Sequence, residues 1–209
     1  MLQFDEGNFH ALCDQLANKD KRLKTILDEW GYPPMWTRPN TFETLVLTIL
    51  EQQVSLAAAF AAYKKLKDYT RITPKHILAL SDEELRACYF TRQKTGYVRG
   101  LAQAILSKEI ILKDFETMED EAVRNRLKQL KGIGDWTVDI YLIHVLRRLN
   151  LFPLGDIALL NAVRMLCNNK ELTKTEISEI AEKWKPTRTI ATMMLWHLYI
   201  KKKNIKILH

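Results

Sequence analysis

Apolar residues recur three or four positions apart along almost the whole chain, and this spacing constrains the fold more than any other feature. It is the period of a helix that buries one face, whereas a half-buried strand alternates at every second residue. The pattern is clear over residues 9–16 and 23–30 and returns in most later segments, among them residues 136–149, where it predicts one helix. We therefore predict an all-α fold with about ten helices and no strand.

Short local signals place several of the helix ends. Thr73-Pro74 predicts a helix start, because proline is well tolerated in the first turn. Ser81 is followed three residues later by Glu84, the spacing of a capping box. The polar stretch 51–55 interrupts a long apolar pattern over residues 41–66 and predicts a break or a turn between two helices.

Composition narrows the class of protein. The 209 residues are 47% hydrophobic, with only seven glycines and six prolines, as in folded globular chains. The net charge of +7 favours an anionic partner, nucleic acid first and an acidic protein or membrane surface second. Three distant cysteines without a CxxC pair, and histidines without ligand spacing, predict neither a disulfide framework nor a zinc site.

A glycine-rich turn predicts a phosphate-binding hairpin in the stretch Leu130-Lys131-Gly132-Ile133-Gly134-Asp135-Trp136-Thr137. A helix start offers unpaired N–H groups, and glycine permits a positive φ and close approach of a phosphate. An ordinary turn between two helices is the alternative. Asp135 argues against phosphate binding by its charge, unless it caps the following helix.

Asp156 ends the segment Phe152-Pro153-Leu154-Gly155-Asp156 and precedes an apolar helix. Aspartate is a favoured N-cap, and that structural role is one interpretation. The other is catalytic, because a carboxylate at a helix start close to a phosphate-binding turn would face the same ligand. The sequence alone leaves both open.

Two tryptophans and two glutamines add to a DNA-directed interpretation. Trp136 and Trp196 are either core residues or the walls of a pocket that stacks an extruded base, with cation–π attraction to an alkylated one. Gln52 and Gln53 form either a polar turn or a wedge inserted into the base stack. The basic residues Arg92, Lys94 and Arg99 predict either phosphate contacts or a solvated face.

Taken together, these residues resemble the helix-hairpin-helix DNA glycosylase superfamily, and within it 3-methyladenine DNA glycosylase II of the AlkA type. The resemblance runs from about residue 20 to residue 199. Its landmarks are Asp20-Lys21-Arg22-Leu23, Ile49-Leu50-Glu51-Gln52-Gln53-Val54-Ser55, Arg92-Gln93-Lys94, Leu130 to Thr137, Gly155-Asp156 and Trp184-Lys185-Pro186-Thr187-Arg188.

The resemblance implies a fold and a set of site residues. One unit spans residues 1–209, with helical lobes at roughly 41–115 and at 1–40 plus 116–209, an active-site cleft between them, and no N-terminal sheet domain. Asp156 corresponds to the catalytic aspartate, and Gln53 to the wedge. The base pocket is assigned to Trp136, Trp196 and Tyr141, and the DNA contacts to Gln52, Gln53, Ser55, Gly132, Ile133, Gly134 and Thr137.

The same resemblance bears on cofactors and subtype. Carbonyls of Leu130 and Ile133 correspond to ligands of a bound Na⁺ or K⁺, and no other cofactor is expected. Family members that also cut the strand carry a lysine where this chain has Trp136, so no lyase step is expected. No cysteine follows Cys167, so no iron–sulfur cluster is expected. Ile140 stands where some members have a pocket tyrosine, and Tyr141 is its neighbour.

The implied activity is that of a monofunctional, monomeric glycosylase of base excision repair, which removes 3-methyladenine and 7-methylguanine flipped out of damaged double-stranded DNA. A non-catalytic protein that binds bent or damaged DNA is the alternative, and a basic protein with an acidic partner is a third. No signal peptide or membrane-length apolar run is seen. We expect the cytoplasm, associated with the nucleoid, in a bacterium and the nucleus in a eukaryote.

Overall fold

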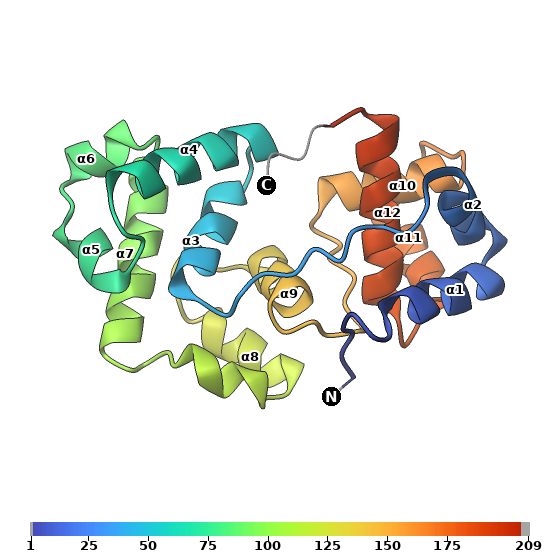
Figure 1. The fold of residues 1–209 in the computed structure, drawn as a ribbon, viewed down its shortest axis with the longest axis horizontal. Coiled ribbons are helices and arrows are strands. Elements are labelled where there is room, and N and C mark those ends of the chain that lie inside the picture. Colours follow the sequence, from blue (N-terminus) through green and yellow to red (C-terminus); the bar gives the residue numbers. More distant parts are fainter. Residues whose placement is uncertain (1, 206–209) are drawn as a thin grey trace. The chain divides into compact units, whose positions relative to one another are not determined.

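The computed structural model describes residues 2–205, which contain twelve α-helices and one short 3₁₀ helix (Figure 1). Within these residues the extended pairing is limited to one isolated antiparallel bridge between Gln3 and Arg148. The all-α fold predicted from the apolar spacing is therefore confirmed. The number of helices is slightly larger than predicted.

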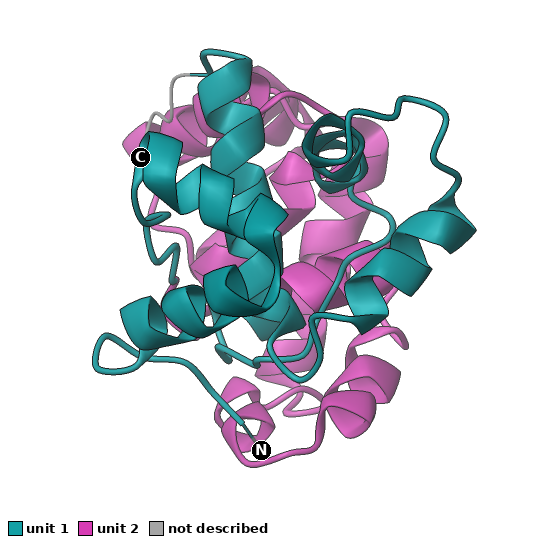
Figure 2. Ribbon diagram, turned by 90° about the vertical axis from the view of Figure 1, so that its right-hand side faces the viewer, with its two compact units in different colours: residues 1–37, 142–206 teal, residues 38–141, 207–209 magenta. Residues whose placement is uncertain are grey.

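The described chain divides into two compact units, which Figure 2 colours separately. Unit 1 comprises residues 2–37 and 142–205, and unit 2 comprises residues 38–141. The predicted lobes placed residues 116–141 with the chain termini, whereas the structure assigns them to unit 2. Two side-chain hydrogen bonds join these residues to the rest of unit 2, since Gln52 bonds Thr137 and Tyr141 bonds Asn40.

Unit 1 is built around its last helix, α12 (Arg188–Lys202). Every residue from Thr189 to Leu198 is buried, so this helix is covered on all sides, as expected for the centre of a helical core. Helices α1, α2 and α10 pack against it. The other helices of unit 1 are α1 (Phe9–Lys19), α2 (Lys21–Trp30), α10 (Ile157–Leu166) and α11 (Lys174–Glu182).

The carboxylate of Asp20 joins three parts of unit 1. Oδ1 accepts the Arg22 backbone N–H at 3.0 Å and so caps α2, while Oδ2 binds Arg22 Nη2 at 2.7 Å. Oδ2 also accepts a hydrogen bond from Nε1 of the fully buried Trp184 at 3.0 Å. Burial raises the pKa of Asp20, but the hydrogen bonds from Arg22 and Trp184 outweigh it and lower that pKa to about 2.

Residues 145–149 differ from the sequence-based prediction. The apolar pattern predicted a helix through Leu149, but α9 (Asp135–His144) ends earlier. Arg147 has a positive φ of 54°, and its carbonyl accepts the Phe4 N–H at 3.0 Å. Pairing with the N-terminal residues buries this segment. In the sequence, its apolar residues look like a continuation of the helical pattern.

Unit 2 is arranged around α7 (Arg92–Leu106), which packs against α3, α5 and α6. The buried residues of α7, which include Val98, Leu101 and Ala102, form one stripe along the helix. The other elements are α3 (Phe42–Glu51), α4 (Leu56–Tyr69), α5 (Pro74–Ala79), α6 (Asp82–Ala87), the 3₁₀ helix η1 (Leu112–Glu116), α8 (Asp120–Leu127) and the start of α9.

The local helix signals in unit 2 are confirmed. Pro74 occupies the first turn of α5, and Thr73 caps that helix. Ser81 and Glu84 form both bonds of a capping box at the start of α6. The polar stretch 51–55 separates α3 from α4, as predicted.

Replacing Asp20 by Asn should change how stability depends on pH. A carboxyl whose pKa falls from 3.8 to about 2 on folding stabilises the folded state above about pH 4, and this contribution is lost as the pH falls towards 2. We expect a change of about 1 kcal/mol between pH 6 and pH 3, measured as the unfolding free energy in urea. Asn keeps the helix cap, so the variant should be less stable at pH 6 and show a shallower acid slope. Equal slopes for both proteins would contradict this role of Asp20.

Candidate functional site

The glycine turn is a tight hairpin between α8 and α9. Gly132 has a φ of +89°, and a Cβ at this position would overlap the ring of Tyr97 from α7. The Ile133 N–H closes the turn on the Leu130 carbonyl at 3.1 Å, and the Ile133 side chain is buried. Gly132 is therefore required by both the backbone conformation and the packing.

Gly134 plays a different part from the one its sequence suggested. Its φ is not in the left-handed region, it is exposed, and a Cβ there would meet no atom within 4 Å. It directly precedes α9, whose N-terminus carries about half a positive charge. The open space beside this helix start suits an incoming phosphate, while the turn itself depends on Gly132 alone.

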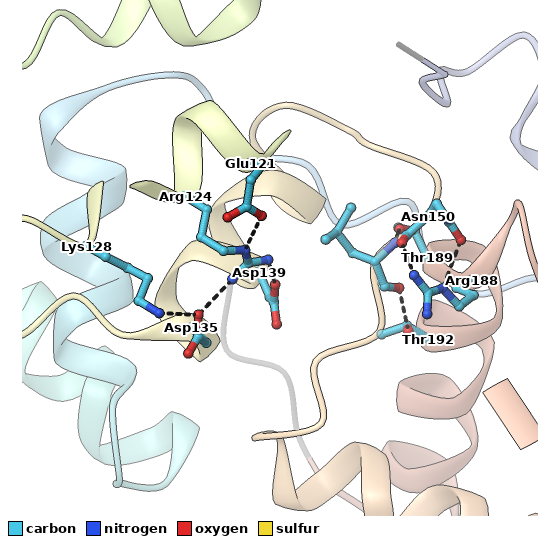
Figure 3. A network of polar contacts seen from close by, with 10 residues as sticks. Glu121, Arg124, Lys128, Asp135, Asp139, Asn150, Arg188, Thr189 and Thr192 are labelled. Carbon is cyan, nitrogen blue, oxygen red and sulfur yellow. Dashed lines mark hydrogen bonds and ion pairs between the residues drawn. The ribbon is translucent and has the colours of Figure 1, made fainter. Parts of the chain in front are cut away.

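The charge of Asp135 is paired with Arg124 of α8 and with Lys128, the residue after this helix, which removes the main objection to phosphate binding. Lys128 donates to Asp135 Oδ1 at 2.8 Å and Arg124 donates to the same oxygen at 3.1 Å (Figure 3). Arg124 also binds Asp139 on the next turn of α9. The hydrogen bond from Lys128, with help from Arg124, lowers the pKa of Asp135. Asp135 is the first residue of α9 and acts through these ion pairs, which its place in the sequence did not reveal.

The turn between α3 and α4 is tied to the hairpin by one side chain. Gln52 Nε2 donates to the Gly132 carbonyl and to Thr137 Oγ1, both at 2.9 Å. Thr137 is buried, so the sequence-predicted DNA contacts Gln52 and Thr137 face each other inside unit 2. We call residues 52–55 the wedge loop.

The exposed part of the wedge loop is its centre. Gln53 is exposed and has a positive φ of 55°, and the apolar side chains of Val54 and Leu56 are also exposed. Ser55 Oγ accepts the Ala58 N–H at 3.2 Å and caps α4. The insertion of Gln53 into DNA and the DNA contact of Ser55 stay predictions, and the exposed apolar neighbours suit contact with bases.

Three residues predicted as one basic group have separate places. Lys94 donates to the carbonyls of Leu50 and Gln52 at 2.6 and 2.9 Å, and Arg99 binds Asp82 and the Leu80 carbonyl. Neither side chain belongs to a solvated basic face, because both bind acceptors within unit 2. Arg92 is exposed. The sequence could not show this, because the acceptors of Lys94 lie more than 40 residues away.

In unit 1, Asp156 is the N-cap of α10. Its Oδ1 accepts the Leu159 backbone N–H at 2.8 Å and Trp196 Nε1–H at 3.3 Å. The structural interpretation of Asp156 is thus confirmed, and it coexists with a chemical one. Two fixed donors on one oxygen hold the half-buried carboxylate in a defined orientation.

Trp196 is itself held in place by its neighbours. It is 9% exposed, and its ring stacks on His144 with centroids 5.4 Å apart and an interplanar angle of 15°. The ring nitrogen Nδ1 of His144 lies 2.6 Å from the Trp36 carbonyl oxygen. No role for His144 was predicted from the sequence, whereas in the structure its ring supports the indole that bonds Asp156.

The segment that leads to Asp156 is fixed by α12, as the second network in Figure 3 shows. Arg188 donates to both the side chain and the carbonyl of Asn150, at 2.8 and 3.0 Å. Thr189 Oγ1 accepts the Leu151 N–H at 3.0 Å. Because α12 also carries Trp196, a single helix positions the backbone before Asp156 and one oxygen of its carboxylate.

The remaining predicted pocket residues lie in unit 2. Trp136 is half-buried in the first turn of α9. Tyr141 is 1% exposed, its hydroxyl donates to Asn40 Oδ1 at 2.6 Å, and its ring meets Phe115 edge-on at 6.0 Å. Tyr141 is therefore a core residue in this structure. The base pocket formed by Trp136, Trp196 and Tyr141 stays a prediction.

The hairpin carbonyls are compatible with the predicted monovalent cation. A carbonyl oxygen has two lone pairs, and the Leu130 oxygen uses one for the Ile133 N–H. Backbone oxygens are suitable ligands for Na⁺ or K⁺. Elsewhere in residues 2–205, no group of three or more His, Cys, Asp or Glu side chains is placed to hold a metal ion. Across the same residues every helix is too short or too polar to span a bilayer.

Substituting the two hairpin glycines should separate folding from ligand binding. Gly132→Ala should lower the unfolding free energy by at least about 2 kcal/mol, because Ala is strained at this φ and clashes with Tyr97. Gly134→Leu should leave stability within about 1 kcal/mol and weaken binding to a DNA duplex, since only an incoming phosphate needs the space. Urea unfolding and duplex titration measure the two effects. A folded Gly134→Leu protein with unchanged affinity would show that no phosphate approaches the hairpin.

Comparison with known proteins places these features in a family. Residues 46–187 match the family described as HhH-GPD superfamily base excision DNA repair protein. A DNA-3-methyladenine glycosylase of Bacillus subtilis is 30% identical over 209 residues, which cover 93% of this chain and 69% of the relative. DNA-3-methyladenine glycosylase 1 of Schizosaccharomyces pombe is 30% identical, over 84% of this chain and 80% of that protein.

Solved structures agree with the sequence relatives. The 3-methyladenine DNA glycosylase of Schizosaccharomyces pombe in complex with abasic DNA superposes with a TM-score of 0.84 at 29% identity, over 92% of this chain and 97% of that one. A DNA-3-methyladenine glycosidase of Bacillus halodurans gives a TM-score of 0.76 at 27% identity, over 98% and 95% of the two chains. The chain belongs to the HhH-GPD superfamily of base excision DNA repair proteins.

Proposed function

We propose that this protein is a monofunctional DNA glycosylase that hydrolyses the N-glycosidic bond of alkylated purines, 3-methyladenine and 7-methylguanine, in damaged double-stranded DNA. The observation that carries the proposal is the Asp156 carboxylate, oriented by the Leu159 and Trp196 N–H groups in a chain whose relatives are named DNA-3-methyladenine glycosylases. The family membership supports a base excision activity, and the named relatives support the alkylated substrate.

Hydrolysis of the bond to an alkylated base requires few protein groups besides this carboxylate. Alkylation at N3 or N7 gives the base a positive charge and makes it a good leaving group, so no general acid is required. The sugar then develops oxocarbenium character as the bond breaks. Asp156 stabilises that charge electrostatically and orients or deprotonates the attacking water. The Leu159 and Trp196 bonds keep the carboxylate in place during the reaction.

In the proposed reaction, unit 2 supplies the grip on DNA. The start of α9 and the exposed Gly134 receive a phosphate of one strand, and a cation held by the Leu130 and Ile133 carbonyls would add positive charge there. Gln53 fills the space left by the extruded base. Trp136, half-buried in the first turn of α9, stacks on that base, and a cationic purine gains from its electron-rich ring. We propose that the enzyme acts as a monomer, in the cytoplasm with the nucleoid in a bacterium and in the nucleus in a eukaryote.

Asp156→Asn should abolish most base release without affecting folding. Asn is as good an N-cap as Asp, so α10 keeps its first turn. Loss of the charge should lower the rate of methylpurine release from methylated duplex DNA by about 10²-fold or more, with unchanged duplex affinity. Released bases are separated by chromatography, and thermal unfolding checks the fold.

The controls distinguish this reaction from its alternatives. Asp156→Ser, another good cap without a charge, should behave like Asp156→Asn. Near wild-type release by either folded variant would exclude Asp156 as the reacting carboxylate. Tight binding of methylated duplex without any release by the wild type would instead favour a non-catalytic DNA-binding protein. A shallow salt dependence of duplex binding would argue against DNA and for an acidic protein partner.

The absence of a lyase step is tested separately. Trp136 stands where strand-cutting relatives carry a lysine, so no amine is expected to attack the sugar. Wild-type protein should leave abasic sites that break only after alkali, and borohydride should trap no covalent complex with DNA. A trapped complex would contradict the monofunctional assignment. Trapping in Trp136→Lys, but not in the wild type, would support this assignment.

A further inference from the structure

The end of helix α3 is held by a half-buried cation. Lys94 Nζ lies 2.6 Å from the Leu50 carbonyl oxygen and 2.9 Å from that of Gln52, and both oxygens belong to the last turn of α3 and its cap. The last carbonyls of a helix lack intrahelical partners and carry the negative end of its dipole. Lys94 therefore satisfies two carbonyls where the wedge loop begins.

The setting of Lys94 is unusual for a surface DNA contact. Its side chain is half-buried, burial lowers its pKa, and no carboxylate pairs with it in residues 2–205. It also lies in the first turn of α7, where a helix dipole disfavours a positive charge. Local helix formation does not account for a lysine here, whereas the α3 carbonyls do.

The opposite side of the wedge loop is fixed by the hairpin. The Gln52 amide holds the Gly132 carbonyl and the Thr137 hydroxyl, while the Gln52 carbonyl accepts from Lys94. Tyr97, three residues after Lys94 on α7, packs against Gly132. Helix α7 thus supports both the wedge loop and the hairpin from within unit 2.

The conformation of Gln53, the residue after Gln52, depends on this support. Gln53 has a φ of 55°, a conformation that costs a residue with a side chain about 1 kcal/mol and persists when the surroundings impose it. The surroundings on its N-terminal side are the bonds that Lys94 and Gln52 make. We infer that Lys94 is a positioning residue, which holds the wedge loop in the conformation that presents Gln53, Val54 and the adjoining Leu56 of α4 to DNA. This role rests on the proposed function.

Lys94→Met tests the inference because it removes the ammonium and keeps a side chain of similar length. In the free protein, the hydrogen-bonded backbone amides at the two ends of the loop, those of Gln52, Ala58 and Ala59, should exchange hydrogen at least about 10-fold faster, since the loop loses its anchor. In the complex with methylated duplex, the single-turnover rate of base release should fall by about 10-fold or more. Lys64→Met, at an exposed lysine of α4 in the same unit, is the matched control and should change neither. Lys94→Arg should recover part of both losses.

The salt dependence of binding separates positioning from phosphate contact. A lysine bound to a phosphate contributes about one unit to the slope of log affinity against log salt. Lys94→Met should leave this slope unchanged, and a fall of about one unit would overturn the inference. The inference would also be overturned if Lys94→Met showed hydrogen exchange in the loop and base release at wild-type rates. If the wild-type protein releases no methylated base, the proposed function fails, and the exchange measurement still decides whether Lys94 orders the loop.

Discussion

One side-chain amide joins two turns of unit 2 that lie 80 residues apart in the sequence, and the arrangement of the hairpin and the wedge loop depends on it. Gln52 fixes the Gly132 carbonyl, and Gly132 in turn has room for its conformation only because it lacks a side chain against Tyr97. Tyr97 and Lys94 stand on the same helix, and Lys94 holds the carbonyl of Gln52. The constraints therefore form a closed circuit through α3, the hairpin and α7, in which each contact limits the movement of the next.

In unit 1, one helix cap has two roles. The Asp156 oxygen that starts α10 also accepts the indole N–H of Trp196, so folding of the helix and orientation of the carboxylate are one event. Helix α12 carries the indole and also binds the segment before Asp156 through Arg188 and Thr189. A helix buried on all sides is a rigid support for this purpose, since its packing leaves little freedom for its side chains.

Local features of the sequence predicted those parts of the structure that local physics determines. The helical period gave the all-α fold, and Ser81 with Glu84 marked a cap that the structure contains. Residues 145–149 were predicted as helix because their burial comes from pairing with the N-terminal segment, a distant partner that no local pattern reveals. The contacts of Lys94 and Asp135 were not predicted for the same reason. Lys94 binds backbone carbonyls and Asp135 binds cations, and these partners lie in other segments of the chain. The candidate acid was found because it stands at a helix start, and its second donor, Trp196, comes from 40 residues further along.

The cap at residue 156 also bears on how such a chain can evolve. Ser and Asn begin a helix about as well as Asp, so selection for a stable fold barely distinguishes among them at this position. Only selection for chemistry keeps the carboxylate. A lineage released from that selection could lose its reaction through one substitution, while its helices, its hairpin and its cellular abundance stay as they were. Folded relatives without the acid are therefore an accessible neighbour of this sequence, and a match in fold alone says little about whether a member of the superfamily is an enzyme.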